Sequence, residues 1–202
     1  MASSFRETLP VALHLAGRNA LLLGGGDEAE DKYTKLRAAG ARVTLVAERT
    51  GETLQRAARC GDLIWFARRF TVSDLVGTQL VLLSEQDVEL ARSLKQHQAR
   101  HAFWLCAIDQ PEYSDFFLVS IVRRGPVQIG ISTGGGAPLL ARRIRQALEA
   151  GLPAGLSEFA RSFADLRASL RSLPKPARTQ HLEQALQGFA MDVQVRYPER
   201  HD

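Results

Sequence analysis

The sequence predicts an α/β fold built on a doubly wound parallel sheet, and three observations support this prediction. Short apolar runs without polar alternation recur along residues 19–108, longer amphipathic runs separate them, and three glycines follow the first apolar run. Strands that are apolar on both faces are typical of parallel sheets covered by helices on both sides. Strands and helices are therefore expected to alternate through this part of the chain.

The strands of the sheet are predicted at 19–24, 41–47, 63–67, 79–84 and 102–108. Helices are predicted between them at 27–40, 50–60 and 87–101. Gly40 suits the end of the first helix, because glycine readily adopts the left-handed conformation found there.

The alternation ends after Asp109. Residues 116–133 predict two strands joined at Arg124-Gly125-Pro126, as a hairpin or a tight crossover, and a second glycine run then leads into a helix. Residues 153–190 are predicted to be helical with a break at 173–177. We therefore expect a nucleotide-binding domain at 1–115, a small β segment with a glycine loop and helix at 116–150, and a helical C-terminal domain at 151–202.

The helical tail carries apolar residues at a helical spacing: Leu156, Phe159, Phe163, Leu166 and Leu170. Such a stripe either packs on its own domain or forms a dimer contact, and the spacing alone does not separate the two.

Composition and charge limit the class of protein. The chain has 202 residues, 45% of them hydrophobic and 24% charged, with a formal net charge of +4. This weak excess of positive charge does not indicate nucleic acid as a partner, although it suits anionic small molecules. No apolar run approaches the ~20 residues of a membrane-spanning helix, and residues 1–17 lack the apolar region of a signal peptide. A cytoplasmic protein without a membrane or nucleic-acid partner is expected.

Cysteine and histidine give little indication of a metal site. Cys60 and Cys106 lack metal-ligand spacing and are expected to be reduced thiols. His97 and His101 are four residues apart and could share a helix face, as zinc-binding pairs do, but the residues around them are polar. We predict no metal ligand.

The first glycine run fits the pattern G-x-G-x-x-[GA] between a predicted strand and a predicted helix. In a Rossmann-type dinucleotide site, Gly24 would permit the sharp turn, Gly26 would let the backbone approach a pyrophosphate, and Ala29 would let the helix pack close to the strand. The amide groups at the start of the helix would then bind the phosphates. The alternative is a glycine-rich turn that binds nothing.

An acidic residue follows the second predicted strand, where such folds bind the adenosine ribose. Glu48 could accept hydrogen bonds from the ribose hydroxyls, which favours NAD over NADP. Arg49 beside it keeps a 2′-phosphate possible.

The second glycine run combines possible anion-binding groups. Ser132 and Thr133 precede the three glycines 134–136, and Arg142 and Arg145 share a face of the following helix. Hydroxyls, free amides and guanidinium groups together could bind an anion. A capped helix with a solvated basic face is the alternative.

Asp109 falls just after the last predicted strand of the sheet. Open α/β folds bind their ligands at this carboxyl edge, so a catalytic carboxylate is one interpretation. Aspartate is also common in turns, which is the other.

With these features, the chain resembles the precorrin-2 dehydrogenase / sirohydrochlorin ferrochelatase family, a module that stands alone or forms the N-terminal part of siroheme synthase. The matching stretches are "LPVALHLAGRNALLLGGGDEAEDK", "LRAAGARVTLVAE" and "IDQPEYSDFFLVSIVRRGPVQIGISTGGGAPLLARRIR". The most specific match is the pattern S-[ST]-G-G-x-[SA]-P-x-L-A-R, which Ser132 through Arg142 meet.

The resemblance implies NAD-dependent oxidation of precorrin-2 to sirohydrochlorin in siroheme or cobalamin biosynthesis, followed in some members by iron insertion. It also implies a homodimer to which the second region and the helical tail contribute. The expected residues are Asp109 for catalysis; Gly24, Gly25, Gly26, Asp27, Glu28, Ala29, Glu48, Arg49 and Ser84 for the cofactor; and Ser132, Thr133, Gly134, Gly135 and Arg142 for the substrate.

The chain departs from the family pattern at several positions. Cys106 and Leu90 stand where asparagines are usual, Val119 stands where a proline is usual, and the run Ser84–Asp87 replaces "A-T-D-D" while keeping one hydroxyl. These departures leave two alternatives open: a non-catalytic protein that binds a tetrapyrrole or a dinucleotide, and a chelatase without a redox step.

Overall fold

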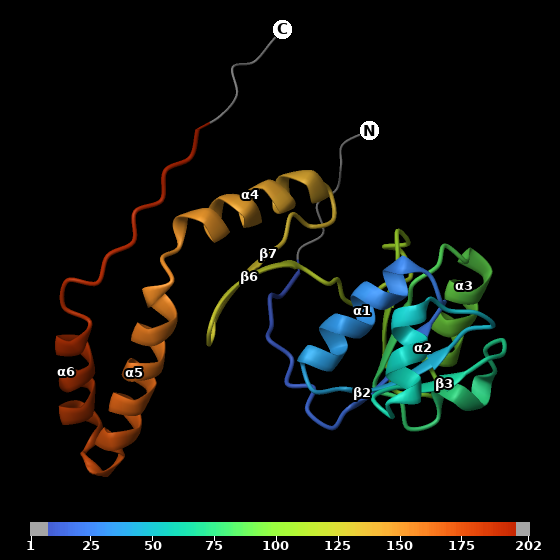
Figure 1. Cartoon of the computed structure of the whole chain (residues 1–202), viewed down its shortest axis with the longest axis horizontal. Helices are drawn as coiled ribbons and strands as arrows, with labels where there is room; N and C mark the ends of the chain where they lie inside the picture. The colour runs from blue at the N-terminus through green and yellow to red at the C-terminus, as the bar shows by residue number, and fades with distance from the viewer. Residues whose placement is uncertain (1–7, 197–202) are drawn as a thin grey trace, which may run out of the picture. The chain divides into compact units, whose positions relative to one another are not determined.

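The structure is a computed structural model, and it describes residues 8–196. The expectation of no signal peptide depends partly on residues 1–7, which lie outside the described residues. The chain forms two compact units (Figure 1). The first unit contains the residues up to Ser120 together with Ser132–Leu140, and the second contains Ile121–Ile131 and the residues from Ala141 onward.

A five-stranded parallel sheet forms the centre of the first unit. Its strands are β1 (Asn19–Leu23), β2 (Arg42–Val46), β3 (Ile64–Phe66), β4 (Leu80–Leu83) and β5 (Trp104–Ala107), and all five predicted strands are thereby confirmed. Their spatial order is β3-β2-β1-β4-β5. This order is that of a doubly wound Rossmann-type sheet, in which the direction of winding reverses between β1 and β4.

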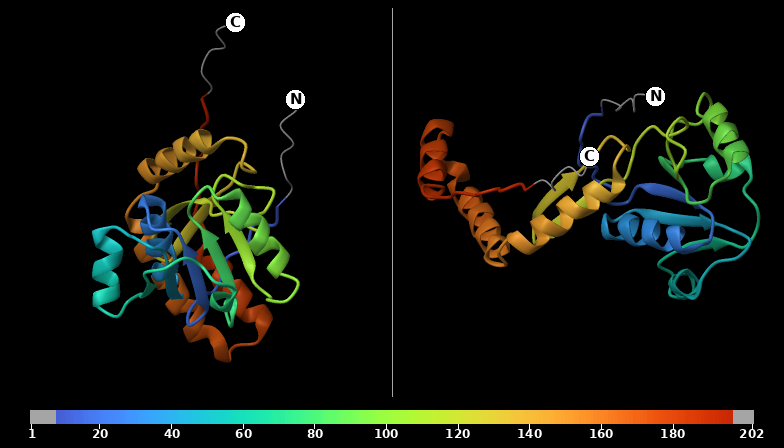
Figure 2. Two further views of the ribbon diagram at one scale, coloured as in Figure 1. Left: turned by 90° about the vertical axis from the view of Figure 1, so that its right-hand side faces the viewer. Right: turned by 90° about the horizontal axis from the view of Figure 1, so that it is seen from above.

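Helices cover both faces of the sheet (Figures 1 and 2). The helices α1 (Asp27–Ala38) and α2 (Glu52–Arg59) pack on one face, where Ala29, Leu36 and Leu54 join a core with alternate strand residues. The helix α3 (Val88–His97) and the short 3₁₀ helix η1 (Val72–Leu75) pack on the other. Both cores are apolar, which explains why the strands lack polar alternation.

The end of α1 agrees with the prediction, and the end of α3 differs from it. Gly40 follows α1 with a φ of 81°, as expected for a helix end. The helix α3 ends at His97, four residues earlier than predicted. His101 therefore lies outside the helix, and the two histidines do not share a helix face.

The outer edge of β5 is closed by side chains from the loop that follows it. The Leu105 amide donates to Asp115 Oδ2 over 2.9 Å, and the Ala107 amide donates to Ser114 Oγ over 3.0 Å. The Asp115 amide donates back to the Leu105 carbonyl over 2.7 Å. Burial opposes ionisation of Asp115, but donors that include Lys95 and the Leu105 amide outweigh it and lower the pKa of the carboxyl.

The second unit begins with a two-stranded sheet of β6 (Ser120–Arg124) and β7 (Val127–Ile131), so the predicted strand pair is a hairpin. Gly125 occupies the turn with a φ of 57°, and a Cβ there would lie 2.0 Å from Ser157 Oγ. Glycine is therefore required both for the backbone conformation and for the close approach of the turn to the following helix.

Three helices follow the hairpin: α4 (Pro138–Gly151), α5 (Gly155–Ser169) and α6 (Lys175–Ala185), with the 3₁₀ turn η2 (Leu170–Ser172) between the last two. The predicted break at 173–177 is confirmed at Leu173 and Pro174, which separate η2 from α6, and α6 begins at Lys175. Pro176 lies in the first turn of α6, where its missing N–H has no helical partner to lose.

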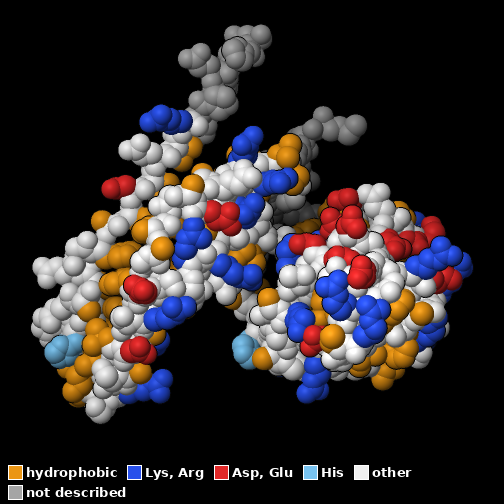
Figure 3. All heavy atoms as spheres, viewed as in Figure 1, with side chains coloured by type: hydrophobic (Ala, Val, Ile, Leu, Met, Phe, Trp, Pro, Cys, Tyr) orange, Lys and Arg blue, Asp and Glu red, His pale blue; other side chains and the backbone are white. Residues whose placement is uncertain are grey.

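The second unit buries few of its apolar side chains. Of its described hydrophobic residues, Val122, Ala141 and Leu152 are buried, whereas α5 and α6 contain no buried residue. Figure 3 shows hydrophobic side chains exposed along these helices. An amphipathic helix normally buries its apolar stripe, so the stripe on α5 is unusual. Within residues 8–196, no helix is long and apolar enough to span a membrane.

Candidate functional site

A cavity of about 880 Å³ lies at the carboxyl edge of the sheet in the first unit. Its lining consists of Leu23, Gly24, Val46, Ala47, Glu48, Arg49, Arg68, Arg69, Phe70, Leu83, Glu85, Asp87 and Leu90. These residues end or follow β1, β2, β3 and β4, so the cavity includes the point where the strand order reverses. Doubly wound sheets bind their ligands at this point.

The first two glycines of the loop after β1 are required by packing. Gly24 has a φ of 100°, and a Cβ there would lie 2.6 Å from Ser84 Oγ. A Cβ on Gly25 would lie 1.8 Å from the Arg49 carbonyl oxygen. A side chain at Gly25 would collide with backbone, which cannot move aside as a flexible side chain can. At Gly24 the positive φ and the buried Ser84 hydroxyl both oppose a side chain.

The third glycine leaves room for a ligand. A Cβ on Gly26 would meet nothing within 4 Å, and Gly26 begins α1 without a side-chain cap. The amide groups of Gly26, Asp27 and Glu28 find no acceptor among the described residues. Free amides at a helix start attract anions.

A carboxylate already contacts this loop. Glu85, which follows β4, accepts a hydrogen bond from the Gly25 amide over 3.0 Å. Its carboxylate shows that the loop presents an amide to an anionic oxygen. The donors and the open space at Gly26 thus fit the pyrophosphate of a dinucleotide.

The remaining residues predicted around this loop have different environments. Asp27 is exposed at the start of α1, and Glu28 forms an ion pair with Lys32 over 2.7 Å. Ala29 is fully buried against the sheet. The Ser84 hydroxyl is buried and donates to the Leu23 carbonyl over 2.8 Å, so it holds β1 and β4 together.

Glu48 and Arg49 follow β2 and line the cavity, as does Arg69. Glu48 accepts a hydrogen bond from Arg69 Nε over 3.2 Å, and both side chains are mostly exposed. Arg49 is exposed and forms no ion pair with any residue in 8–196.

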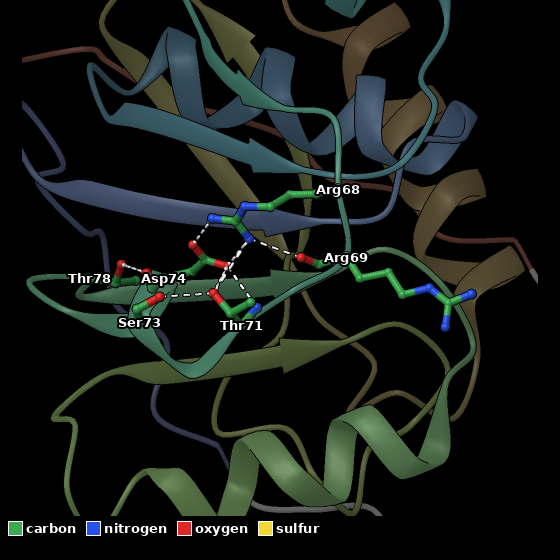
Figure 4. Close-up of polar contacts among 6 residues, drawn as sticks. All are labelled: Arg68, Arg69, Thr71, Ser73, Asp74 and Thr78. Carbon is green, nitrogen blue, oxygen red and sulfur yellow. Dashed lines mark hydrogen bonds and ion pairs between the residues drawn. The ribbon is translucent and has the colours of Figure 1, made fainter.

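A second arginine in the loop after β3 is held firmly (Figure 4). Arg68 donates twice to Asp74, with Nη2–Oδ1 at 2.6 Å and Nη1–Oδ2 at 2.8 Å, and its Nη1 also donates to the Arg69 carbonyl over 2.9 Å. The Arg68 guanidinium and the Thr71 amide and hydroxyl lower the pKa of the Asp74 carboxyl, whose side chain is 6% exposed. This cluster fixes the loop that presents Arg69.

Asp109 lies two residues beyond β5 at the same edge of the sheet. It is exposed and has a φ of 52°, and its Oδ2 accepts a hydrogen bond from Gln86 Nε2 over 2.9 Å. Glu85 and Gln86 are consecutive, so one short loop contacts both the glycine run and Asp109.

The second glycine run forms a compact turn. The Gly134 amide donates to Ser132 Oγ over 3.3 Å, and the Gly136 amide donates to the Thr133 carbonyl over 3.1 Å. Gly134 and Gly135 both have positive φ, at 60° and 82°.

The arginines on α4 differ in their partners. Arg145 is paired with Glu149 over 2.5 Å, whereas Arg142 is exposed and forms no ion pair with a described residue. Arg142 therefore keeps a guanidinium available, and Arg145 does not.

The departures from the family pattern fall in different places. Cys106 is buried in the core beneath α1, and burial raises the pKa of its thiol. Leu90 lines the cavity, and Val119 is half-buried just before β6. Within residues 8–196 no group of three or more histidine, cysteine or acidic side chains could hold a metal ion.

Sequence reasoning missed Glu85, Gln86, Arg68 and Arg69 as parts of the site. The positions of all four could have indicated them, because they directly follow β3 or β4 at the carboxyl edge. Their pairing with Gly25, Asp109, Asp74 and Glu48 depends on how loops meet across the sheet, which a single sequence does not reveal.

Comparisons with known proteins agree with this fold. Residues 11–120 match the family described as "Putative NAD(P)-binding", and residues 124–150 match the family described as "Sirohaem biosynthesis protein central". The solved structure of SirC, precorrin-2 dehydrogenase, superposes with a TM-score of 0.76 at 20% identity and covers 88% of each chain.

Curated relatives are similar over most of this chain. The siroheme synthase of Methylococcus capsulatus is 31% identical over 192 residues, which are 94% of this chain and 40% of that protein. Siroheme synthase 1 of Pectobacterium atrosepticum is 38% identical over 84% of this chain and 36% of its own length. The chain thus spans about two fifths of these relatives or less.

Proposed function

The chain belongs to the NAD(P)-binding family matched by residues 11–120, and from this premise we propose that it oxidises precorrin-2 to sirohydrochlorin with NAD as the hydride acceptor. The resemblance of its motifs to the siroheme-biosynthesis family supports this reaction, and so does its similarity to siroheme synthases and to the precorrin-2 dehydrogenase SirC. The family match indicates a nicotinamide dinucleotide, either NAD or NADP, and we propose NAD.

The observation that carries the proposal is the loop after β4. Glu85 contacts the Gly25 amide and Gln86 contacts the Asp109 carboxylate, so a cofactor cradle and a candidate base lie beside each other in one unit. A binding protein would need the cradle alone. A dehydrogenase also needs a proton acceptor close to the nicotinamide.

The proposed chemistry divides two hydrogens between two acceptors. A bound nicotinamide would supply the acceptor for one hydrogen of the macrocycle and its electron pair. The second hydrogen leaves as a proton, which the Asp109 carboxylate accepts. Gln86 keeps this carboxylate oriented through its hydrogen bond, and Asp109 then releases the proton to water, to which it is exposed.

The cofactor contacts follow from the loop geometry. The amides of Gly26, Asp27 and Glu28 would bind the pyrophosphate, and Glu48 would accept from the ribose hydroxyls. Glu85 must leave the Gly25 amide or remain beside the phosphates. In the first case binding costs the Glu85–Gly25 hydrogen bond, and in the second the Glu85 charge repels the phosphates, so Glu85 lowers the affinity for the dinucleotide in both.

Several groups would bind the carboxylates of the macrocycle. The turn amides of Gly134 and Gly135, the hydroxyls of Ser132 and Thr133, and the unpaired Arg142 have the chemistry for this role. We assign cofactor binding to residues 1–115, substrate contacts and dimerisation to 116–150, and assembly of a homodimer to the helical residues 151–202.

The test is turnover of precorrin-2 with NAD by Asp109→Asn. Asparagine tolerates positive φ, so the backbone at 109 is retained while the proton acceptor is lost. We expect turnover to fall by about 10²–10⁴-fold, measured as NADH absorbance together with the product spectrum.

Direct titration of NAD should give the same affinity for this variant as for the wild type. Asp62→Asn, a matched change at an exposed ion pair with Arg37, should be fully active. Binding of NAD without any oxidation of precorrin-2 by the wild type would instead favour a binding protein. Full turnover by Asp109→Asn would remove the proposed role of Asp109.

A further inference from the structure

Four charged residues at the ends of β2 and β3 line the cavity together: Glu48, Arg49, Arg68 and Arg69. They lie beyond the edge of the glycine loop, in the region where a Rossmann-type sheet binds the adenosine ribose. Asp74 neutralises Arg68, so Arg49 and Arg69 remain beside the single carboxylate Glu48. This excess of one positive charge is unexpected for a site that binds only the uncharged ribose hydroxyls of NAD.

Arg68 and Arg69, in the loop after β3, differ in the groups that they contact. Arg68 is committed to Asp74 by two hydrogen bonds, at 2.6 and 2.8 Å, and its third bond holds the Arg69 carbonyl at 2.9 Å. Figure 4 shows the Arg69 side chain extending away from this cluster. Arg68 thus fixes the backbone of Arg69, and the Arg69 guanidinium projects into solvent with a side-chain exposure of 86%.

The contact between Arg69 and Glu48 leaves most donors free. Arg69 uses Nε toward Glu48 Oε1 over 3.2 Å, and its two terminal nitrogens bond to no described residue. Arg49, next to Glu48, also has an unpaired guanidinium among the described residues. Two guanidinium groups with free N–H donors therefore line the same cavity as one partly neutralised carboxylate.

The charges of Glu48, Arg49 and Arg69 determine whether the site can bind the 2′-phosphate of NADP. A lone carboxylate at the ribose discriminates against NADP, because it repels the 2′-phosphate. Here Arg69 offsets the charge of Glu48, and with Arg49 it supplies guanidinium groups that bind phosphate well.

We infer that Arg69 is a specificity-determining residue at the cofactor 2′-position, and that with Arg49 it lets the chain bind NADP as well as NAD. This inference rests on the cofactor site of the proposed function. It adds a second dinucleotide to that site. The same guanidinium shields Glu48 when the ligand is NAD and binds the 2′-phosphate when the ligand is NADP.

The test is direct titration of NAD and NADP by calorimetry, without any macrocycle. We expect the wild type to bind the two within about ten-fold of each other, and Arg69→Ala to weaken NADP by ~10-fold while weakening NAD by a much smaller factor. Arg69→Lys should recover part of the NADP affinity, because it restores the charge without the fork of donors. Arg59→Ala, an exposed arginine at the end of α2, is the matched control and should change neither affinity.

Two results would overturn the inference while leaving the proposed function intact. One is a wild type that binds NAD and oxidises precorrin-2 but does not bind NADP. The other is an unchanged ratio of NAD to NADP affinity in Arg69→Ala. A wild type that binds neither dinucleotide overturns both the inference and the proposed function.

Discussion

Asp109 has the sole positive φ among the described non-glycine residues, at 52°. Non-glycine residues in this conformation are uncommon, and aspartate and asparagine tolerate it best. The sequence placed Asp109 correctly just beyond the last strand of the sheet, but no pattern predicted its backbone conformation. Alanine at 109 would combine backbone strain with loss of the carboxylate. Asparagine removes the carboxylate and tolerates the same φ, so it is the better variant for testing the role of Asp109.

At the same scale, Glu85 is expected to weaken the binding of its own cofactor. Its carboxylate contacts the Gly25 amide, next to the amides that should bind the pyrophosphate in the complex. Glu85→Gln keeps a hydrogen-bond acceptor and removes the charge, so we expect dinucleotide affinity to rise by about 3–10-fold. Fluorescence titration with NADH measures this change.

Glu89→Gln is the control for Glu85, because Glu89 pairs with Arg92 on α3 and does not line the cavity. An unchanged or weaker affinity of Glu85→Gln would mean that the Glu85 carboxylate does not oppose the ligand. Its contact with the loop would then have only a structural role.

At the scale of elements, the strands and helices of the sheet were predictable because each has a local signal. Apolar runs of strand length, the glycine loop and the terminal Gly40 all act through neighbouring residues. The helix η1 and its cluster were not predictable. Arg68 and Asp74 meet only because the loop after β3 folds back on itself, and neither residue alone differs from an ordinary exposed charge.

The Arg68–Asp74 cluster should stabilise the first unit in a pH-dependent way. The pKa of Asp74 is lowered in the folded state, so its contribution is full above the unfolded pKa of about 3.9 and is lost as pH falls through the folded value. We expect Asp74→Asn to cost roughly 1–2 kcal/mol of unfolding free energy at pH 7, and the cost to shrink below about pH 4.

Urea unfolding followed by tryptophan fluorescence measures this effect in the first unit, because Trp65 and Trp104, the two tryptophans of the chain, both belong to it. Asp62→Asn should change stability much less, since Asp62 and Arg37 are both well exposed. A stability difference for Asp74→Asn that stays constant from pH 7 to pH 3 would contradict the proposed role of the ionised carboxylate.

At the scale of the whole molecule, the two units are unequal in their cores. The sheet of the first unit is enclosed by two apolar clusters, whereas α5 and α6 contain no buried residue. An apolar groove of about 400 Å³ in the second unit is lined by residues that include Val127, Leu156, Phe159 and Met191. The tail stripe at Phe159 was predictable from spacing, but spacing could not tell whether its own domain would cover it.

We expect a second copy of the chain to cover this groove. Phe159 stacks on Phe189 with ring centroids 5.4 Å apart, yet it remains 38% exposed. Phe159→Asp places a charge in the apolar surface, which should weaken self-association by at least ~100-fold. Sedimentation velocity should show a dimer for the wild type and a monomer for the variant.

Val76→Asp, at an exposed apolar residue of the first unit, is the control and should remain dimeric. A wild type that sediments as a monomer at every concentration would refute the homodimer. Dimeric Phe159→Asp would show that the copies associate through another surface.

The closed edge of β5 has a consequence for how the sheet can grow. An edge strand with free amides can accept a strand from another molecule, which is the first step of sheet-mediated aggregation. The amides of Leu105 and Ala107 are already bonded to Asp115 and Ser114. A sixth strand therefore has no amide donors to pair with on this side, and two side chains of the following loop protect this edge of the sheet against polymerisation.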